Sequence, residues 1–187
     1  MYVPTKIFLT AGKGVHREKL ASFEIALRDA GIGPFNIVCV SSIFPPHCQL
    51  ISRDEGRPLL REGQILHVVM SKSETEEPGR LIAAAVGLAI PKDPSQYGYL
   101  SEHHSYGQTK PEAGHYAEVL AANMLATVLG EKEIRFSKRP GKKNGMWRIN
   151  PKDRSPNIVK TLNITAAAEG DSMIRWTTVL AAAVLIP

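Results

Sequence analysis

The 187-residue sequence contains only two cysteines, Cys39 and Cys48, and no C-x₂-C pair. A disulfide framework needs more cysteines in a shorter chain, and structural zinc sites draw their thiolates from closely spaced pairs, so both are excluded. Two free, reduced thiols are expected, as in a cytoplasmic protein.

Long apolar runs are also missing. Residues 81–90 and 178–186 are rich in Ala, Val and Leu, but a membrane-spanning helix needs roughly 20 such residues. Residues 1–6 lack the apolar run of a signal peptide. We therefore predict a soluble cytoplasmic protein without a membrane partner.

Common catalytic motifs are absent: there is no G-x-x-x-x-G-K-[ST], no H-E-x-x-H and no G-x-S-x-G. Residues 11–14, Ala-Gly-Lys-Gly, lack phosphate-loop spacing and predict a turn. His103, His104 and His115 could suggest a metal, but neighbouring residues on a strand point to opposite faces. We expect these histidines to lie on the surface or line a site, and we expect no metal.

Composition is that of an ordinary globular chain, with 43% hydrophobic and 22% charged residues, enough for one core. The net charge of +5 is unevenly placed, because residues 131–160 carry +7 and the rest −2. Residues 138–156 combine this basic character with glycines and prolines, which predicts an exposed loop or long hairpin.

Hydrophobic periodicity outlines the first elements. Residues 6–10 predict a strand that ends in the turn at 11–14. Residues 17–30 predict a helix with Leu20, Phe23 and Leu27 on one apolar stripe, and Gly31 is the expected C′ glycine.

Further strands are predicted at 35–40, 64–70, 157–167 and 176–186. Residues 81–90 are apolar on both faces, which fits a buried strand or a buried helix, and the flanking residues with Pro91 favour a strand. Residues 110–129 predict a helix, with Thr109 and Glu112 at capping-box spacing and Gly130 after the last turn. Strands outnumber helices without regular βαβ alternation, which favours an α+β fold.

Residues 36–46 are unusual because two serines, Ser41 and Ser42, lie between a strand and a Pro-Pro pair. The simplest interpretation is a strand that ends in a polar turn. Alternatively, the Ser42 hydroxyl attacks the preceding carbonyl, where proximity contributes roughly 7–11 kcal/mol. Twisting the peptide by ~12° adds only about 1 kcal/mol, so the oxyanion also needs electrostatic stabilisation.

The sequence resembles the pyruvoyl-dependent arginine decarboxylase family from about residue 5 to 130 and from 161 to the end. The basic segment 138–156 is not matched. The matching stretches are Asp29-Ala30-Gly31-Ile32-Gly33, Phe35-Asn36-Ile37-Val38, Val40-Ser41-Ser42-Ile43-Phe44-Pro45-Pro46, Ala89-Ile90-Pro91-Lys92-Asp93, Gly98-Tyr99-Leu100-Ser101-Glu102-His103-His104, Ala168-Glu169-Gly170-Asp171 and Trp176-Thr177-Thr178-Val179-Leu180-Ala181-Ala182-Ala183-Val184.

The resemblance implies a proenzyme. Ser42 attacks the carbonyl of Ser41 to give an ester, and β-elimination and hydrolysis then leave a pyruvoyl group on residue 42. The products are fragments 1–41 and 42–187. Asn36 is implied to assist the cleavage, and Glu102 matches the catalytic acid. A single-domain four-layer αββα sandwich is implied, as are trimers, or dimers of trimers, with sites between subunits.

The chemistry of a pyruvoyl group follows from its ketone, which forms a Schiff base with a substrate amine and accepts the electrons released with carbon dioxide. A proton must then return to carbon, and a protonated Glu102 is a suitable donor. The alternative for Glu102 is a carboxylate paired with a neighbouring cation.

The resemblance also implies the substrate, L-arginine, and its product agmatine, which enters polyamine synthesis. Glu24 stands where an acidic residue of the family faces the guanidinium, and a carboxylate binds that group in bidentate geometry. Some members have the shorter Asp there, so lysine and ornithine stay open as substrates. The implied pocket-lining residues are Leu27, Gly33, Phe35 and Ile43.

A second hypothesis is a nucleic-acid-binding protein that uses the basic tract 132–154. Its positive charge suits phosphates, but only Phe136 and Trp147 offer stacking surfaces and no known module is present. A solvated loop is the simpler interpretation of the tract.

Overall fold

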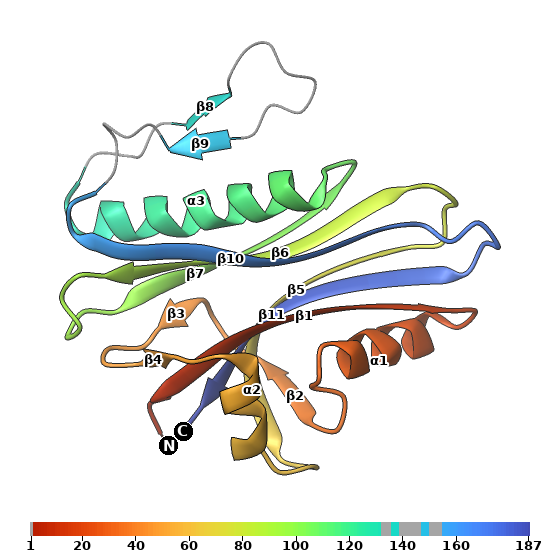
Figure 1. Cartoon of the computed structure of the whole chain (residues 1–187), viewed down its shortest axis with the longest axis horizontal. Helices are drawn as coiled ribbons and strands as arrows, with labels where there is room; N and C mark the ends of the chain where they lie inside the picture. The colour runs from red at the N-terminus through yellow and green to blue at the C-terminus, as the bar shows by residue number, and fades with distance from the viewer. Residues whose placement is uncertain (1, 132–135, 139–146, 150–154) are drawn as a thin grey trace.

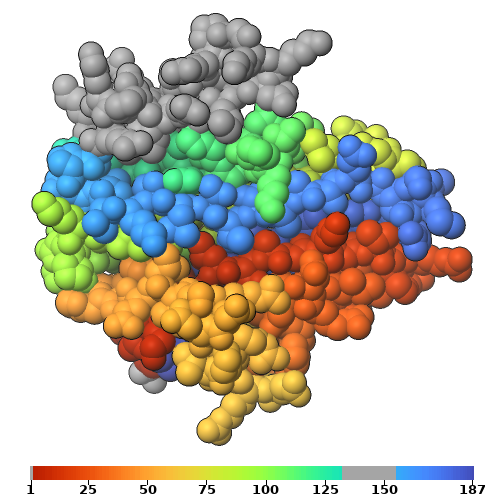
Figure 2. Space-filling view, viewed as in Figure 1, coloured from red at the N-terminus to blue at the C-terminus, as the bar shows by residue number. Residues whose placement is uncertain are grey.

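The computed structural model describes residues 2–131, 136–138, 147–149 and 155–187. Two β-sheets stack face to face, and one long helix covers the outer face of each (Figure 1). The single-domain αββα sandwich that we expected is therefore confirmed. In Figure 2 the N-terminal segments, in red and orange, form one side of this stack and α3 (Lys110–Val128), in green, lies on the other.

The first sheet has the order β2-β5-β11-β1-β4. Its strands are β1 (Lys6–His16), β2 (Asn36–Cys39), β4 (Gln49–Leu50), β5 (Ile65–Thr75) and β11 (Trp176–Ile186). The N- and C-terminal strands are neighbours, and β1 pairs antiparallel with β11 along its whole length. This pairing places the two ends of the chain side by side (Figure 1).

The second sheet has the order β10-β6-β7-β3. Its strands are β3 (Ile43–Phe44), β6 (Leu81–Pro91), β7 (Gly98–Tyr106) and β10 (Ile158–Glu169). β6 is apolar on both faces because Val86 and Leu88 face the first sheet while Ala83, Ala85 and Ala89 face α3. The apolar run at 81–90 is therefore a buried strand, as predicted.

Helix α3 begins at the predicted capping box, in which the Glu112 carboxylate accepts hydrogen bonds from the Thr109 N–H and hydroxyl at 2.8 and 2.7 Å. Small residues let the helix approach the sheet closely. A Cβ at Gly87 would collide with the backbone of Ala117 on α3.

The predicted turn at residues 11–14 is wrong, because β1 runs straight through it. A Cβ at Gly12 or Gly14 would meet backbone atoms of α1 (Lys19–Asp29), at Ala26 and Ser22 respectively. These glycines therefore serve close packing of strand and helix. In a strand, alternate positions share one face, so both glycines lie beneath α1.

The predicted apolar stripe on α1 is partly wrong. Leu20 is 78% exposed, whereas Ser22 and Ala26 are fully buried. The close approach of β1 leaves room only for small side chains there. Phe23 and Leu27 pack at the margin of the core, and Gly31, with φ +75°, ends the helix as predicted.

The short elements include α2 (Arg53–Gly56) and a 3₁₀ turn at Arg57–Leu59. β8 (Phe136–Lys138) and β9 (Trp147–Ile149) pair antiparallel. The rest of the predicted basic loop at 138–156 lies outside the described residues, except for 155 and 156, and so does most of the tract 132–154. Among the helices that the structure describes, none has the length and apolar character to cross a membrane.

Candidate active site

The link between β2 and β3 passes from one sheet to the other and contains Ser41 and Ser42. At one end, the Val40 N–H donates to the Val68 carbonyl of the first sheet at 2.9 Å. At the other, the Ser42 carbonyl accepts from the Leu100 N–H of the second sheet at 2.8 Å. The Ser41–Ser42 peptide is therefore held from both sides.

Ser42 meets Glu102 at this crossing. The Ser42 hydroxyl donates to Glu102 Oε2 at 3.1 Å. The pairing of β3 with β7, in which Ile43 lies opposite Tyr99, brings these residues together although they are 60 positions apart in sequence. Ser42 is half-buried and Glu102 is exposed, so the contact between them is accessible to solvent.

Cys39 and Lys72 extend this surface toward α1. Burial raises the pKa of the Cys39 thiol, the Glu102 carboxylate raises it further, and the Lys72 ammonium lowers it. Lys72 Nζ lies 4.5 Å from the centre of the Phe23 ring on α1. Glu102 and Lys72 therefore both act electrostatically on Cys39. No sequence motif pointed to Cys39 or Lys72.

Asn36 begins β2, and its side chain is directed away from the serines. Its Nδ2 donates to the Gly63 carbonyl at 2.7 Å. Because β2 pairs in parallel with β5, Asn36 lies beside Ile65, at the end of the strand opposite the link. The described hydrogen bonds of Asn36 thus do not include Ser41 or Ser42.

Glu24 lies on α1 and binds a guanidinium, that of Arg28, with 2.7 Å between Glu24 Oε2 and Arg28 Nη2. The Glu24 side chain is 50% exposed. A Cβ at Gly33 would lie 2.8 Å from Cγ of Arg28, so the Arg28 stem covers this glycine. Leu27 and Phe35 pack in the adjoining core. Four of the five expected pocket residues thus gather around the C-terminal half of α1.

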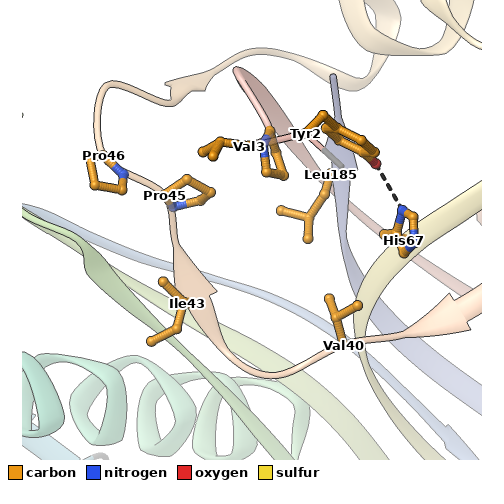
Figure 3. Close-up of a pocket in the computed structure, with 9 residues that line it drawn as sticks. Tyr2, Val3, Val40, Ile43, Pro45, Pro46, His67 and Leu185 are labelled. Atoms are coloured by element: carbon orange, nitrogen blue, oxygen red, sulfur yellow. Dashed lines mark hydrogen bonds between the residues drawn. The ribbon is translucent and has the colours of Figure 1, made fainter.

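Ile43, the fifth, lines a different space. Together with Val40 it borders an apolar cavity of about 510 Å³ (Figure 3). The Tyr2 hydroxyl and His67 Nδ1, 2.8 Å apart, lie at its rim. The other lining residues are Val3, Pro4, Pro45, Pro46 and Leu185. Nothing in the sequence pattern indicated this cavity.

The histidines and cysteines occupy ordinary positions. His103 Nε2 lies 2.7 Å from Gln108 Oε1 and its ring packs on Tyr116, while His104 is exposed. Within the described ranges, no group of three His, Cys, Asp or Glu side chains could hold a metal. Both cysteines are free, and burial raises the pKa of Cys48 to about 11.

Comparisons with known proteins cover the whole chain. Residues 6–187 match a family model described as pyruvoyl-dependent arginine decarboxylase. A protein of Chloroherpeton thalassium named probable pyruvoyl-dependent arginine decarboxylase is 53% identical over 100% of this chain and 99% of its own. Proteins of Nitrosopumilus maritimus and Methanocella arvoryzae, named pyruvoyl-dependent arginine decarboxylase, are 52% and 51% identical over 98% of this chain and 97% and 96% of theirs. The matches include the basic segment 138–156, so the expectation that this segment lies outside the resemblance is wrong.

Proposed function

Because this chain belongs to the pyruvoyl-dependent arginine decarboxylase family, we propose that it cuts itself between Ser41 and Ser42, carries a pyruvoyl group made from Ser42, and converts L-arginine to agmatine and carbon dioxide. The observation that carries the proposal is the 3.1 Å contact between the Ser42 hydroxyl and Glu102. This contact places the hydroxyl that must react beside the carboxylate that we expect to transfer protons.

Cleavage begins with the Ser42 hydroxyl at the Ser41 carbonyl. The Oγ–C bond forms, the C–N bond breaks, and the hydroxyl proton passes to nitrogen, so an amide becomes an ester. Loss of the Ser41 carboxylate then leaves dehydroalanine at 42, and water replaces its nitrogen as ammonia. Anchoring at Val68 and Leu100 supports the first step because it fixes the reacting atoms near each other.

The surroundings of residue 42 fit a pyruvoyl group. Leu100 N–H would hold the residue 42 carbonyl as it does now, and the Glu102 carboxyl lies beside the former side chain. The group supplies a ketone that condenses with the substrate amine and accepts the electron pair left by carbon dioxide. Glu102 is then in place to return a proton to carbon.

For the substrate end, we propose that Glu24 binds the guanidinium of arginine. The Arg28 contact supports this because it shows the carboxylate already engaged with the same functional group. An (i, i+4) ion pair that is half exposed contributes only about 0.3–0.5 kcal/mol, so a bidentate substrate can displace it.

The site is open in the single chain, because Glu102 is exposed. We propose that trimers, or dimers of trimers, close it with a neighbouring subunit, which would exclude water from the proton transfer. The free thiols of Cys39 and Cys48 suit a cytoplasmic location. Light scattering of the purified protein measures the assembly, and a monomer would contradict this part of the proposal.

Denaturing electrophoresis and mass spectrometry of the purified protein test the maturation. Native protein should give fragments 1–41 and 42–187, the second blocked to Edman degradation. Ser42→Ala should stay intact because the nucleophile is gone, whereas Ser41→Ala, the matched control, should still be cut. A native chain that stays whole and releases no carbon dioxide from arginine would refute the proposed function.

A further inference from the structure

The scissile peptide lies in a tight turn. The Ile43 N–H donates to the Ser41 carbonyl oxygen at 3.1 Å, an i to i+2 hydrogen bond that closes a γ-turn around Ser42. Ser42 is not among the residues with positive φ, so the turn is of the common inverse type. The acceptor is the oxygen on which charge would develop when the Ser42 hydroxyl attacks.

The competing donors near the link are engaged elsewhere. The Leu100 N–H donates to the Ser42 carbonyl, and the Val40 N–H to Val68. Asn36 Nδ2, the donor that the sequence suggested as an assistant, is bound to the Gly63 carbonyl at 2.7 Å. In the part of the chain that the structure describes, Ser41 therefore receives its hydrogen bond from Ile43.

From this geometry, which presupposes the proposed self-cleavage, we infer that the main-chain amide of Ile43 is the oxyanion donor of that reaction. As Ser42 Oγ bonds to the Ser41 carbon, the carbonyl electrons move onto oxygen, where the Ile43 N–H already points. They return when the C–N bond breaks and nitrogen takes the hydroxyl proton. The donor is thus present before the charge is, which is what electrostatic preorganisation requires.

The second sheet fixes this amide. Ile43 is the first residue of β3 and pairs with Tyr99, while the next residue, Phe44, is 3% exposed and lies opposite Gly98. A Cβ at Gly98 would lie 3.3 Å from Phe44 Cβ, so the strands are closely packed here. A backbone donor held in this way cannot rotate away as a side chain can.

The Ile43 side chain plays a separate part, because it faces the apolar cavity (Figure 3). A shorter side chain at 43 would enlarge that cavity and leave the amide in place. Side-chain and main-chain roles of the residue can therefore be separated by experiment.

The test replaces residue 43 with the α-hydroxy analogue of isoleucine, introduced by nonsense suppression in cell-free translation. The resulting backbone ester has an oxygen where the N–H was. We expect cleavage of the precursor, followed on denaturing gels, to slow by roughly 10²–10³-fold, the usual loss for one oxyanion donor. Suppression of the same codon with isoleucine itself, which keeps the amide, should give cleavage at the native rate.

The matched control is the α-hydroxy analogue of leucine at Leu100, which removes the neighbouring hydrogen bond to the Ser42 carbonyl but not the one to Ser41. A smaller effect at Leu100 than at 43 supports the inference. Equal rates for the two esters, or native-like cleavage of the residue 43 ester, overturn it. Failure of the native chain to cleave would instead refute the proposed function.

Discussion

Replacement of Glu102 by glutamine separates the two reactions proposed for the site. The amide oxygen of glutamine can still accept the hydrogen bond that the Ser42 hydroxyl makes at 3.1 Å, so cleavage should proceed. Glutamine has no acidic proton to return to the substrate carbon. Loss of a positioned acid costs roughly 10²–10⁴-fold in rate, or about 3–5 kcal/mol. We therefore expect normal fragments and a turnover number lowered by that factor, measured by release of carbon dioxide.

The thiol of Cys39 gives a readout of the same carboxylate that does not depend on turnover. Burial and then the Glu102 charge raise the pKa of Cys39, so removing the charge should lower the pKa and increase the thiolate fraction near pH 8. Alkylation of Cys39 by iodoacetamide should be faster in Glu102→Gln than in native protein. Near-native turnover in a variant with faster alkylation would show that Glu102 is a neighbouring charge and not the proton donor.

Three further outcomes are expected. Glu24→Ala should leave cleavage intact and raise the KM for arginine more than that for lysine, whereas equal changes would place the specificity determinant elsewhere. Arg28→Ala should lower the KM for arginine about twofold, because the Glu24–Arg28 ion pair that competes with the substrate contributes only about 0.3–0.5 kcal/mol. An unchanged KM would show that this ion pair does not compete. Gly12→Ala should lower the free energy of unfolding by about 1–3 kcal/mol, and Tm by roughly 2–4 °C per kcal/mol, because the new Cβ would meet α1. The comparison is with Lys13→Ala, both in an uncut Ser42→Ala background, and an equal Tm for the two would contradict the close packing.

The sequence predicted the elements whose signals are local in the chain. β11 has the predicted bounds, and α3 begins at its capping box, because apolar runs and helix caps are local signals. Gly12 and Leu20 were wrongly predicted because their positions depend on how β1 packs against α1. A glycine that allows a helix to approach a strand closely looks the same in sequence as a glycine in a turn. Such a choice is made by tertiary packing, which periodicity does not record.

The site was predictable only through resemblance. A Ser-Ser pair carries no signal by itself, and the contact between Ser42 and Glu102 depends on the pairing of β3 with β7. The two-residue length of β3 leaves no periodicity to detect. Residues such as Lys72 and Cys39, which shape the charge at the site, were invisible because their partners come from other strands.

β1 pairs with β11 along its whole length, from Lys6 opposite Ile186 to His16 opposite Trp176. This pairing has a consequence for how the protein refolds after it has unfolded. A cut at Ser41 would leave β1 on the small fragment, hydrogen-bonded between β11 and β4 of the large one. The folded enzyme would hold together, but once unfolded its two chains would have to find each other again. Reassembly would then be second order and fail on dilution, whereas the uncut precursor could refold at a rate independent of concentration.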